Sequence, residues 1–425
     1  MRCFGLPARA SQKSRGLARY ELLVAASYLP GITKDHHKQG SMMRVAVNAL
    51  FLNYPHSGIG QYLIRLITEL GKKYPGDEYL LFAPGDNLEG HAFPPNVTIE
   101  RVAMRSPGGR RVEKFLWEQR SFPLVGRRSG AEVLHVPYFA TPFRQPLPTV
   151  VTIHDVIPLR LPVYKTSGAV RAYNALVSQA SRRASLIITV SQYSKRDIQE
   201  ALGIPEERIR VVLEAAGPQF RPVKDTVALA AARERYGLGE RYLLYVGGFD
   251  DRKNVAALIQ AFSRLLAEVD EPELQLMVAG DTSRLGSATY PDWRPLAEHL
   301  GVMARIRTGD VDDADLPLLY SAAIAFVYPS LYEGFGLNPL EAMACGAPVI
   351  CSNRTSLPEV VGSAALLVDP KEPGAMAGTI ARLLSDGELR ATLQRQSLAR
   401  AAQFSWKHAA TETHAVFEEA LTSKA

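Results

Sequence analysis

The sequence has few cysteines, no long apolar run and little excess charge over most of its length. Cys3, Cys345 and Cys351 are the only cysteines among 425 residues, and they form neither an even disulfide framework nor a C-x-x-C metal pair. We therefore expect a reducing, cytoplasmic location. No run of 18 apolar residues occurs, because prolines and polar residues interrupt the most apolar stretch, 316–329, so we expect no membrane-spanning helix. A hydrophobic content of 47% excludes a mostly disordered chain.

The net charge of +6 is concentrated at the start of the chain. Seven Lys or Arg and two Asp or Glu lie within residues 1–41, so the remainder is nearly neutral and no nucleic acid partner is expected. Residues 1–42 carry a weak apolar patch without a signal-peptide cleavage site, which predicts a disordered leader. Because residues 42–47 resemble a first buried strand, our hypothesis is that the leader reflects a start codon chosen too far upstream.

Short β-branched runs alternate with helical patterns from Arg44 onward. Most runs are apolar throughout, which is typical of parallel strands covered by helices on both faces. The sequence therefore predicts an α/β fold of two doubly wound parallel sheets, with a linker near 214–224. The expected strands are 45–50, 79–82, 133–136, 150–154, 186–190, 209–213, 242–246, 274–278, 304–308, 324–328, 348–351 and 365–368.

Two turns after predicted strands of the first half are candidate sites, because open parallel sheets bind ligands beyond the carboxyl ends of their strands. Gly58 lies in a strand-to-helix turn that would let backbone amides approach an anion, but a plain tight turn explains it equally well. His154 ends another strand and could hydrogen-bond a ligand or be satisfied by backbone groups. A metal phosphohydrolase of the His-Asp type is discounted, because that class needs an all-helical scaffold.

Arg252 and Lys253 follow the first strand of the second half, directly before a predicted helix. Two cations at a helix start are unfavourable with the helix dipole unless an anion binds between them. An Arg fork and a Lys point charge suit a diphosphate, although a solvated basic turn is the alternative.

The segment 328–346 is the most informative. A strand is followed by a Gly-spaced turn and a helix, for which Asn338 as N-cap, Pro339 at the first position and Glu341 form a capping pattern. Glu333 has no such structural explanation. Its carboxylate lies in what we expect to be an exposed turn, directly before a Gly-Phe-Gly sequence whose backbone amides would suit phosphate oxygens. A carboxylate beside a phosphate cradle predicts a nucleotide-sugar ligand.

Two acidic pairs, Asp310 with Asp312 and Asp313 with Asp315, have the spacing of D-x-D metal motifs. They lie between a predicted strand and a predicted helix, where N-capping acids are the simpler explanation. We predict no metal and no cofactor.

The segment 333–350 resembles the E-x7-E signature of retaining glycosyltransferases of family four, which have the GT-B fold of two Rossmann-like domains facing a central cleft. Further matches follow in order, so that the resemblance extends from Arg44 to about Phe417. They are Gly58, 152–155, 190–194, 247–254, 278–280 and 309–311.

The resemblance implies a domain organisation and a role for each motif residue. It implies an acceptor-side domain at 43–220, a nucleotide-sugar domain at 221–402 and a C-terminal helix, 403–425, that crosses back to the first domain. Glu333 would bind donor-sugar hydroxyls and His154 would contact the sugar near its anomeric carbon; both are the predicted catalytic residues. The donor-binding residues it implies are Gly58 (phosphate), Arg252 and Lys253 (diphosphate), Val311, the cradle Gly334, Phe335, Gly336 and Leu337, and Glu341 (ribose). Many members carry an Arg where this chain has Gly248, so its charge is assigned to Arg252.

The resemblance further implies retention of anomeric configuration without an established protein nucleophile and without a metal. The motifs resemble a mannosyltransferase-like branch that builds surface polysaccharide, so we favour GDP-mannose over UDP-glucose or another nucleotide hexose, with a saccharide or lipid-linked saccharide as acceptor. A nucleotide-sugar epimerase and a nucleotide-sugar sensor are the alternatives. A pyridoxal-phosphate phosphorylase of related fold is a third alternative, but the sequence contains no cofactor-lysine motif that would support it.

Residues 101–128 form a basic segment with aromatic and aliphatic neighbours, represented by Arg110, Arg111 and Lys114. Such a composition suits anionic headgroups, which predicts peripheral binding to the inner face of the cytoplasmic membrane. The alternative is a solvated loop and helix near the acceptor cleft.

Overall fold

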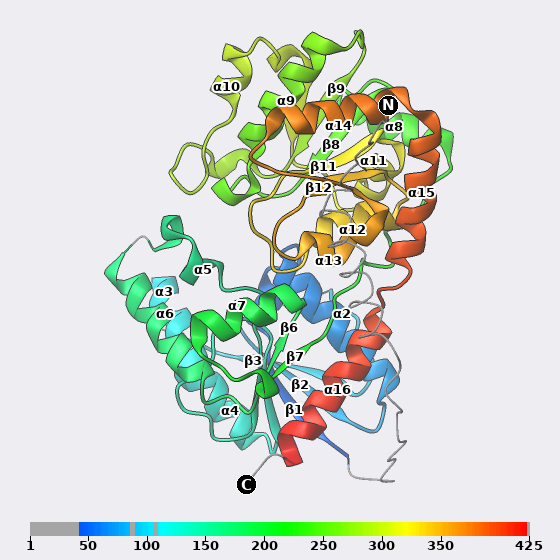
Figure 1. The fold of residues 1–425 in the computed structure, drawn as a ribbon. Coiled ribbons are helices and arrows are strands. Elements are labelled where there is room, and N and C mark those ends of the chain that lie inside the picture. Colours follow the sequence, from blue (N-terminus) through cyan, green and yellow to red (C-terminus); the bar gives the residue numbers. More distant parts are fainter. Residues whose placement is uncertain (1–41, 86–89, 105–108, 166, 423–425) are drawn as a thin grey trace, which may run out of the picture. The chain divides into compact units, whose positions relative to one another are not determined.

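A computed structural model describes residues 42–85, 90–104, 109–165 and 167–422, and the predicted leader lies outside them (Figure 1). The first sheet has seven parallel strands in the order β3-β2-β1-β4-β5-β6-β7. Its strands are β1 Arg44–Asn48, β2 Glu78–Pro84, β3 Val97–Val102, β4 Val133–Val136, β5 Thr149–Thr152, β6 Leu186–Thr189 and β7 Ile209–Val211.

The second sheet has six parallel strands in the order β10-β9-β8-β11-β12-β13. Its strands are β8 Tyr242–Val246, β9 Gln275–Ala279, β10 Ile306–Gly309, β11 Ala325–Tyr328, β12 Val349–Ser352 and β13 Leu366–Val368. The predicted fold class, with two doubly wound parallel sheets, is confirmed.

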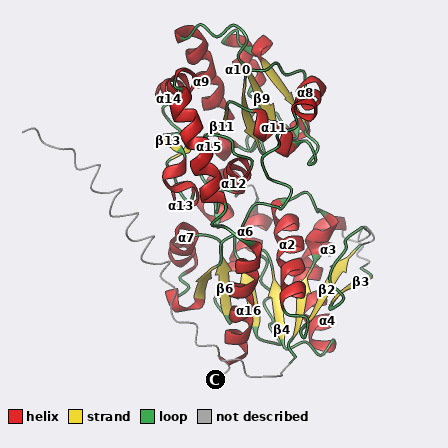
Figure 2. Ribbon diagram, turned by 90° about the vertical axis from the view of Figure 1, so that its right-hand side faces the viewer, coloured by secondary structure: helices red, strands yellow, loops and turns green. Residues whose placement is uncertain are grey.

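Helices lie on both faces of each sheet (Figure 2). Those that follow strands of the first sheet are α2 Gly58–Lys73, α3 Gly109–Leu116, α4 Phe122–Arg128, α5 Ile157–Arg160, α6 Gly168–Ser181 and α7 Gln192–Leu202. Those of the second are α8 Thr226–Arg235, α9 Val255–Glu268, α10 Arg294–His299, α11 Leu316–Ala322, α12 Leu337–Ala344, α13 Leu357–Val361, α14 Pro373–Ser385 and α15 Gly387–Ala401.

The covered faces explain why the strands are apolar throughout. In β1, Val45 and Val47 belong to one hydrophobic cluster, whereas Ala46, between them, belongs to the cluster that contains Trp117 and Phe122. Successive side chains of a strand point to opposite faces, so a sheet buried on both sides needs apolar residues at every position.

The last helix, α16 (Trp406–Thr422), packs on the first sheet although it follows the second in sequence (Figure 1). Trp406 and Phe417 are buried in the same cluster as Val45 and Leu66. His414 Nε2 lies 2.8 Å from Asp77 Oδ2, at the amino end of β2. The chain therefore returns to its first half, while the predicted domain boundaries at residues 220 and 402 stay predictions.

All twelve expected strands occur, and the sequence pattern missed β3. This strand lies at the sheet edge with alternating exposure, and residues 97–102 carry only three apolar side chains, so they lack the continuous apolar run of the other strands. In the described ranges, no helix is long and apolar enough to cross a membrane.

Candidate active site

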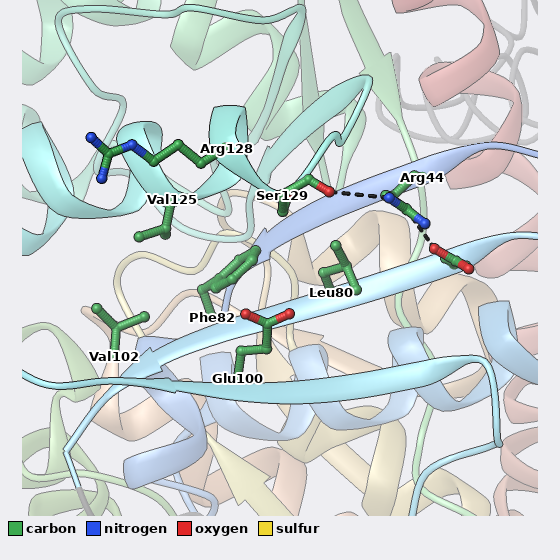
Figure 3. Close-up of a pocket in the computed structure, with 9 residues that line it drawn as sticks. Arg44, Leu80, Phe82, Glu100, Val102, Val125, Arg128 and Ser129 are labelled. Atoms are coloured by element: carbon green, nitrogen blue, oxygen red, sulfur yellow. Dashed lines mark hydrogen bonds and ion pairs between the residues drawn. The ribbon is translucent and has the colours of Figure 1, made fainter.

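A cavity of about 410 Å³ lies beside β2 and β3 (Figure 3). Leu80, Phe82, Val102 and Val125 provide apolar walls. At one end, Arg44 Nε pairs with Glu78 at 2.5 Å. None of the residues expected to bind a donor lines this cavity, so the candidate site is defined by polar contacts instead.

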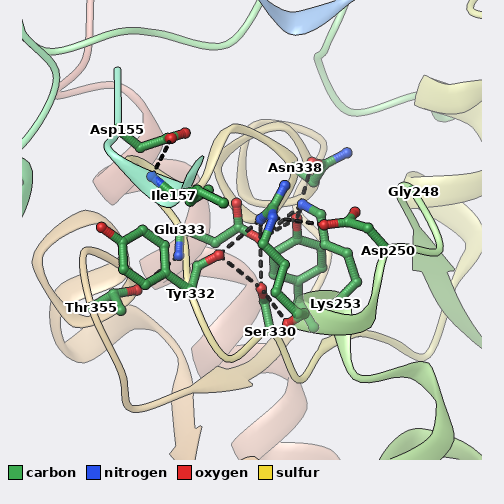
Figure 4. Close-up of polar contacts among 12 residues, drawn as sticks. Asp155, Ile157, Gly248, Asp250, Lys253, Ser330, Tyr332, Glu333, Asn338 and Thr355 are labelled. Atoms are coloured by element: carbon green, nitrogen blue, oxygen red, sulfur yellow. Dashed lines mark hydrogen bonds and ion pairs between the residues drawn. The ribbon is translucent and has the colours of Figure 1, made fainter. Parts of the chain in front are cut away.

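Four donors converge on one carboxylate oxygen after strand β11 (Figure 4). Glu333 Oε1 lies 2.8 Å from Lys253 Nζ, 2.9 Å from Arg252 Nη1, 3.0 Å from Tyr328 Oη and 2.6 Å from Ser330 Oγ. Glu333 is 8% exposed. The expectation of an exposed turn was therefore wrong, because the turn folds back onto the cations that follow β8.

The charges in this cluster are matched to one another. Burial alone would raise the pKa of Glu333, but the charges of Arg252 and Lys253 outweigh it and hold the pKa at about 2. Burial and the neighbouring Arg252 lower the pKa of Lys253. Asp250 supplies a second acidic partner, with its Oδ1 2.7 Å from Arg252 Nε. Glu333 is thus ionised over the whole physiological pH range.

The two cations lie in a short 3-10 turn, η5 (Asp251–Lys253), rather than in a helix. Asn254 follows with φ of +58°, and helix α9 begins at Val255. Lys253 is 7% exposed, so the alternative of a solvated basic turn was wrong. The turn directs both cations onto Glu333, where an additional anion could also be held.

The Gly-rich turn 334–337 presents unengaged backbone donors. Within the described part of the chain, the amide nitrogens of Gly334, Phe335, Gly336 and Leu337 donate no hydrogen bond to a protein acceptor. Gly336 has φ of +125°, and a Cβ there would come within 2.7 Å of Leu357 Cδ2, so only glycine fits. Consecutive free amides at a helix start form an anion-binding arrangement.

The start of α12 differs from the capping prediction. The helix begins at Leu337 with Gly336 as N-cap, so Asn338 and Pro339 already lie inside its first turn. The capping explanation of Glu341 was therefore wrong. Glu341 is half-buried, and burial raises its pKa to about 8, although the charge of Arg65 on α2 opposes the shift.

His154 follows β5 and is held at both ring nitrogens. Nδ1 lies 3.0 Å from Glu214 Oε1, and Nε2 lies 3.2 Å from the carbonyl oxygen of Pro137. Burial would lower the pKa of His154, but the hydrogen bond and charge of Glu214 raise it. These contacts are those expected of a satisfied histidine. The backbone of His154 also touches the Gly turn, because a Cβ on Gly334 would come within 2.4 Å of the His154 carbonyl oxygen.

Sequence reasoning missed the residues that hold this turn from the first half. Ser191 and Ser194 donate to the carbonyl oxygen of Gly334 at 2.6 and 2.9 Å. The Tyr332 hydroxyl contacts the buried carboxylate of Asp197 on α7. The motif 190–194 was noted only as a family match, and no local pattern marks Asp197.

The remaining donor-side predictions are Gly58, the first residue of α2, and Val311. A Cβ on Gly58 would meet no atom within 4 Å, whereas one on Gly60 would come within 2.3 Å of the Tyr54 carbonyl oxygen, so the tight turn itself requires Gly60. Val311 follows β10, and its half-buried side chain packs against the hydrophobic core around the second sheet.

The prediction that the acidic pairs cap the following helix with their side chains was wrong. Asp315 occupies the N-cap position of α11 but makes no side-chain capping bond; instead it pairs with Arg235 and accepts from Tyr236 at 2.8 Å. Asp313 Oδ2 lies 2.7 Å from His56 Nδ1. Among the described residues, no group of three His, Cys, Asp or Glu side chains is suited to a metal ion.

The basic side chains of helix α3 are exposed. Arg110 and Arg111 lie exposed on α3 beside Val112 and Phe115, which are 43% and 40% exposed. Lys114 is also exposed and pairs with the buried carboxylate of Glu118, so its place on a headgroup-binding surface stays a prediction. Arg105, also part of the segment, lies outside the described residues.

Comparisons with known proteins indicate the family of the chain. The model described as "Glycosyltransferase Family 4" matches residues 56–214, and "Glycosyl transferases group 1" matches 231–400. The chain is 34% identical over 380 residues to O-antigen chain mannosyltransferase B of Escherichia coli, covering 85% of this chain and 96% of that protein. It is 32% identical over 269 residues to the serotype-specific mannosyltransferase WbdA of E. coli, covering 62% of this chain but only 32% of that protein.

Solved structures agree on the fold. Sucrose-phosphate synthase from Thermosynechococcus elongatus superposes with a TM-score of 0.69 at 22% identity, covering 88% of this chain and 98% of that one. WaaG, a glycosyltransferase involved in lipopolysaccharide biosynthesis, gives 0.65 at 18% identity with the same coverage. Taken with the two family models and the full-length relative, these findings show that the chain is a glycosyltransferase of family 4, with the GT-B fold, in the mannosyltransferase-like branch.

Proposed function

We propose that this glycosyltransferase moves mannose from GDP-mannose to a saccharide or lipid-linked saccharide acceptor in surface polysaccharide synthesis, with retention of anomeric configuration and without a metal. The observation that carries the proposal is the pairing of Glu333 with Arg252 and Lys253 directly beside four unengaged amides at the start of α12. A sugar and a diphosphate are the ligand groups that such a combination suits.

The sugar, the diphosphate and the ribose of the donor each have a matching group. All four contacts to Glu333 end on Oε1, so Oε2 is the oxygen that we assign to a donor-sugar hydroxyl. We assign the diphosphate to Arg252, Lys253 and the amides of residues 334–337. Glu341, with its pKa of about 8, is protonated in part near neutral pH and suits the ribose hydroxyls as donor or acceptor.

Stabilisation of the leaving diphosphate is the catalytic effect that this arrangement best supports. Preorganised cations and amides act most strongly in a site from which water is excluded, and Lys253 and Glu333 are both buried. With two cations and a helix start available, the departing charge needs no metal. In this scheme the departing phosphate oxygen takes the acceptor proton on the same face of the sugar.

His154 takes a supporting role in the proposal. Its Nδ1 contact with Glu214 is the shorter one, and its Nε2 contact with Pro137, at 3.2 Å, is the longer. We infer that a hydroxyl of the donor sugar replaces the Pro137 contact while Glu214 keeps the ring oriented. The measured consequence would be a loss of kcat in His154→Ala larger than the loss of donor affinity.

The donor preference is supported by the mannosyltransferase names of the relatives that match at 34% and 32% identity. UDP-glucose or another nucleotide hexose is the second candidate. An epimerase would turn over its donor without an acceptor, and a sensor would bind without turnover.

A peripheral position on the inner face of the cytoplasmic membrane is part of the proposal. Arg110 and Arg111 share helix α3 with the exposed side chains of Val112 and Phe115. Cations beside exposed apolar groups favour an anionic surface, with about 1 kcal/mol for each cation near the headgroups.

The test is a thermal-shift panel with GDP, UDP, ADP and their sugars, followed by transfer assays with and without EDTA. A ligand at a hundredfold excess over its Kd raises the free energy of unfolding by about 2.7 kcal/mol. We expect GDP and GDP-mannose to raise the Tm most and EDTA to leave transfer unchanged. A flat panel would refute donor binding, and a manganese requirement would refute the metal-free mechanism.

A further inference from the structure

The turn after β12 contains a strained threonine. Thr355 has φ of +57°, in the left-handed region that glycine adopts easily and β-branched residues avoid. Within the described ranges, Asn254 is the other non-glycine residue with positive φ, and asparagine tolerates this conformation. A strained β-branched residue persists only where the surrounding structure imposes it, and such residues cluster at functional sites.

The strained turn holds the peptide groups around Glu333. The backbone N–H of Glu333 donates to Thr355 Oγ1 at 3.0 Å (Figure 4). Ser356, fully buried, donates its hydroxyl toward the carbonyl oxygens of Glu333 and Phe335, at 3.0 and 2.6 Å. Both the N–H and the C=O of Glu333 are therefore anchored by two consecutive side chains of one turn.

We propose that Thr355 is a positioning residue for sugar transfer, whose strained backbone directs Oγ1 at the Glu333 amide and so fixes the direction of the Glu333 carboxylate. The inference rests on the proposed function, because it assumes that Glu333 binds the donor sugar. The side-chain contacts of Glu333 all end on Oε1, so the position of Oε2 also depends on how the backbone of Glu333 is held. Displacements of about 1 Å in a substrate-positioning group can cost about a hundredfold in rate.

Two substitutions test whether the Thr355 hydroxyl is needed. Thr355→Ser keeps Oγ and removes the methyl group, while Thr355→Gly relieves the backbone strain and removes the acceptor. Asn353→Gly, at an exposed residue of the same turn, controls for added flexibility. The readouts are kcat, KM for GDP-mannose, and Tm.

We expect Thr355→Gly to lower kcat by about tenfold or more, with a smaller change in KM. Its Tm should stay within about 4 °C of wild type, since relief of strain offsets the lost hydrogen bond. Thr355→Ser and Asn353→Gly should keep kcat within about threefold of wild type.

The outcomes are distinguishable. Transfer by wild type and Thr355→Gly at equal rates would refute this inference alone. A parallel loss of Tm and kcat in both Thr355 variants would show that the turn only supports the fold, and would also refute it. No transfer by the wild-type enzyme with any donor would refute the proposed function, and this inference with it.

Discussion

Lys253 is the residue at which donor binding can be tested with Glu333 still paired. Lys253 is buried against Glu333, yet Arg252 contacts the same carboxylate oxygen, so Lys253→Ala leaves Glu333 paired. We expect this variant to weaken GDP binding about tenfold or more, the effect of losing one charge-assisted hydrogen bond. Calorimetric titration with GDP measures it. Lys72→Ala, which removes an exposed ion pair with Glu69 on α2, should bind GDP like wild type. Unchanged GDP affinity in Lys253→Ala would exclude Lys253 from the diphosphate site.

Glu341 predicts a pH dependence with a defined sign. Its pKa in the folded protein is about 8, above the ordinary value of 4.5, so the native state holds this proton more tightly than the unfolded chain does. Between about pH 5 and 8 the contribution of Glu341 to the stability of the native state therefore falls as pH rises. Glu341→Gln removes this effect, and its Tm should exceed that of wild type at pH 8 by more than at pH 5. A constant difference in Tm across that range would contradict the raised pKa.

The sequence predicted which residues of the site belong together but not how they are arranged. Strand ends and turn chemistry identified Glu333, Arg252 and Lys253, because parallel strands place their following turns at one edge. The burial of Glu333 was not predictable, since it depends on the turn 251–253 folding over it. The strained Thr355 was equally hidden, because sequence alone does not indicate a left-handed threonine.

At the scale of elements, α16 shows how a helix distant in sequence completes a core. Phe417 is fully buried, and its ring lies 5.2 Å from that of His135 on β4. We expect Phe417→Ala to lower the free energy of unfolding by about 3–5 kcal/mol, as measured by urea denaturation. Val227→Ala, at a side chain that is 76% exposed, should change it by less than about 0.5 kcal/mol. Equal stability of the two variants would mean that α16 does not support the first core.

Helix α3 is the element that bears on membrane binding. Replacing Arg110 and Arg111 with Glu should reduce co-sedimentation with anionic vesicles, because two favourable charges become two repulsive ones. Binding should also fall with rising salt. Lys114→Glu is not a suitable test, since Lys114 already pairs with buried Glu118. Equal recovery with neutral vesicles, or no effect of the charge reversal, would refute this mode of binding.

The sequence predicted the strands that are buried along their whole length and missed one strand that is partly exposed. Strands covered on both faces were found from their continuous apolar runs, but edge strand β3 was not. The predicted start of α12 was too late, because Asn338 and Pro339 have the residue types typical of an N-cap and a first helical position. The structure uses Gly336 instead, whose positive φ lets the chain turn tightly into the helix.

At the scale of the whole molecule, residues of both sheets meet at the Glu333 turn. Gly334 accepts hydrogen bonds from Ser191 and Ser194, and Glu359 accepts from the first amides of α7 at 2.8 and 3.2 Å. A sequence pattern predicts two sheets and their ligand-binding edges, but not which side chains of one edge contact the other. These contacts connect the proposed donor site to the half of the chain that we expect to bind the acceptor.

The rate of mannose transfer from GDP-mannose by Glu333→Gln is the most direct test of the central claim. Asp77→Asn is the matched control, because Asp77 is also a buried, hydrogen-bonded carboxylate but lies at the amino end of β2. We predict that Glu333→Gln lowers kcat by about a hundredfold or more, while Asp77→Asn stays within about threefold of wild type. Wild-type kcat in Glu333→Gln would contradict the account.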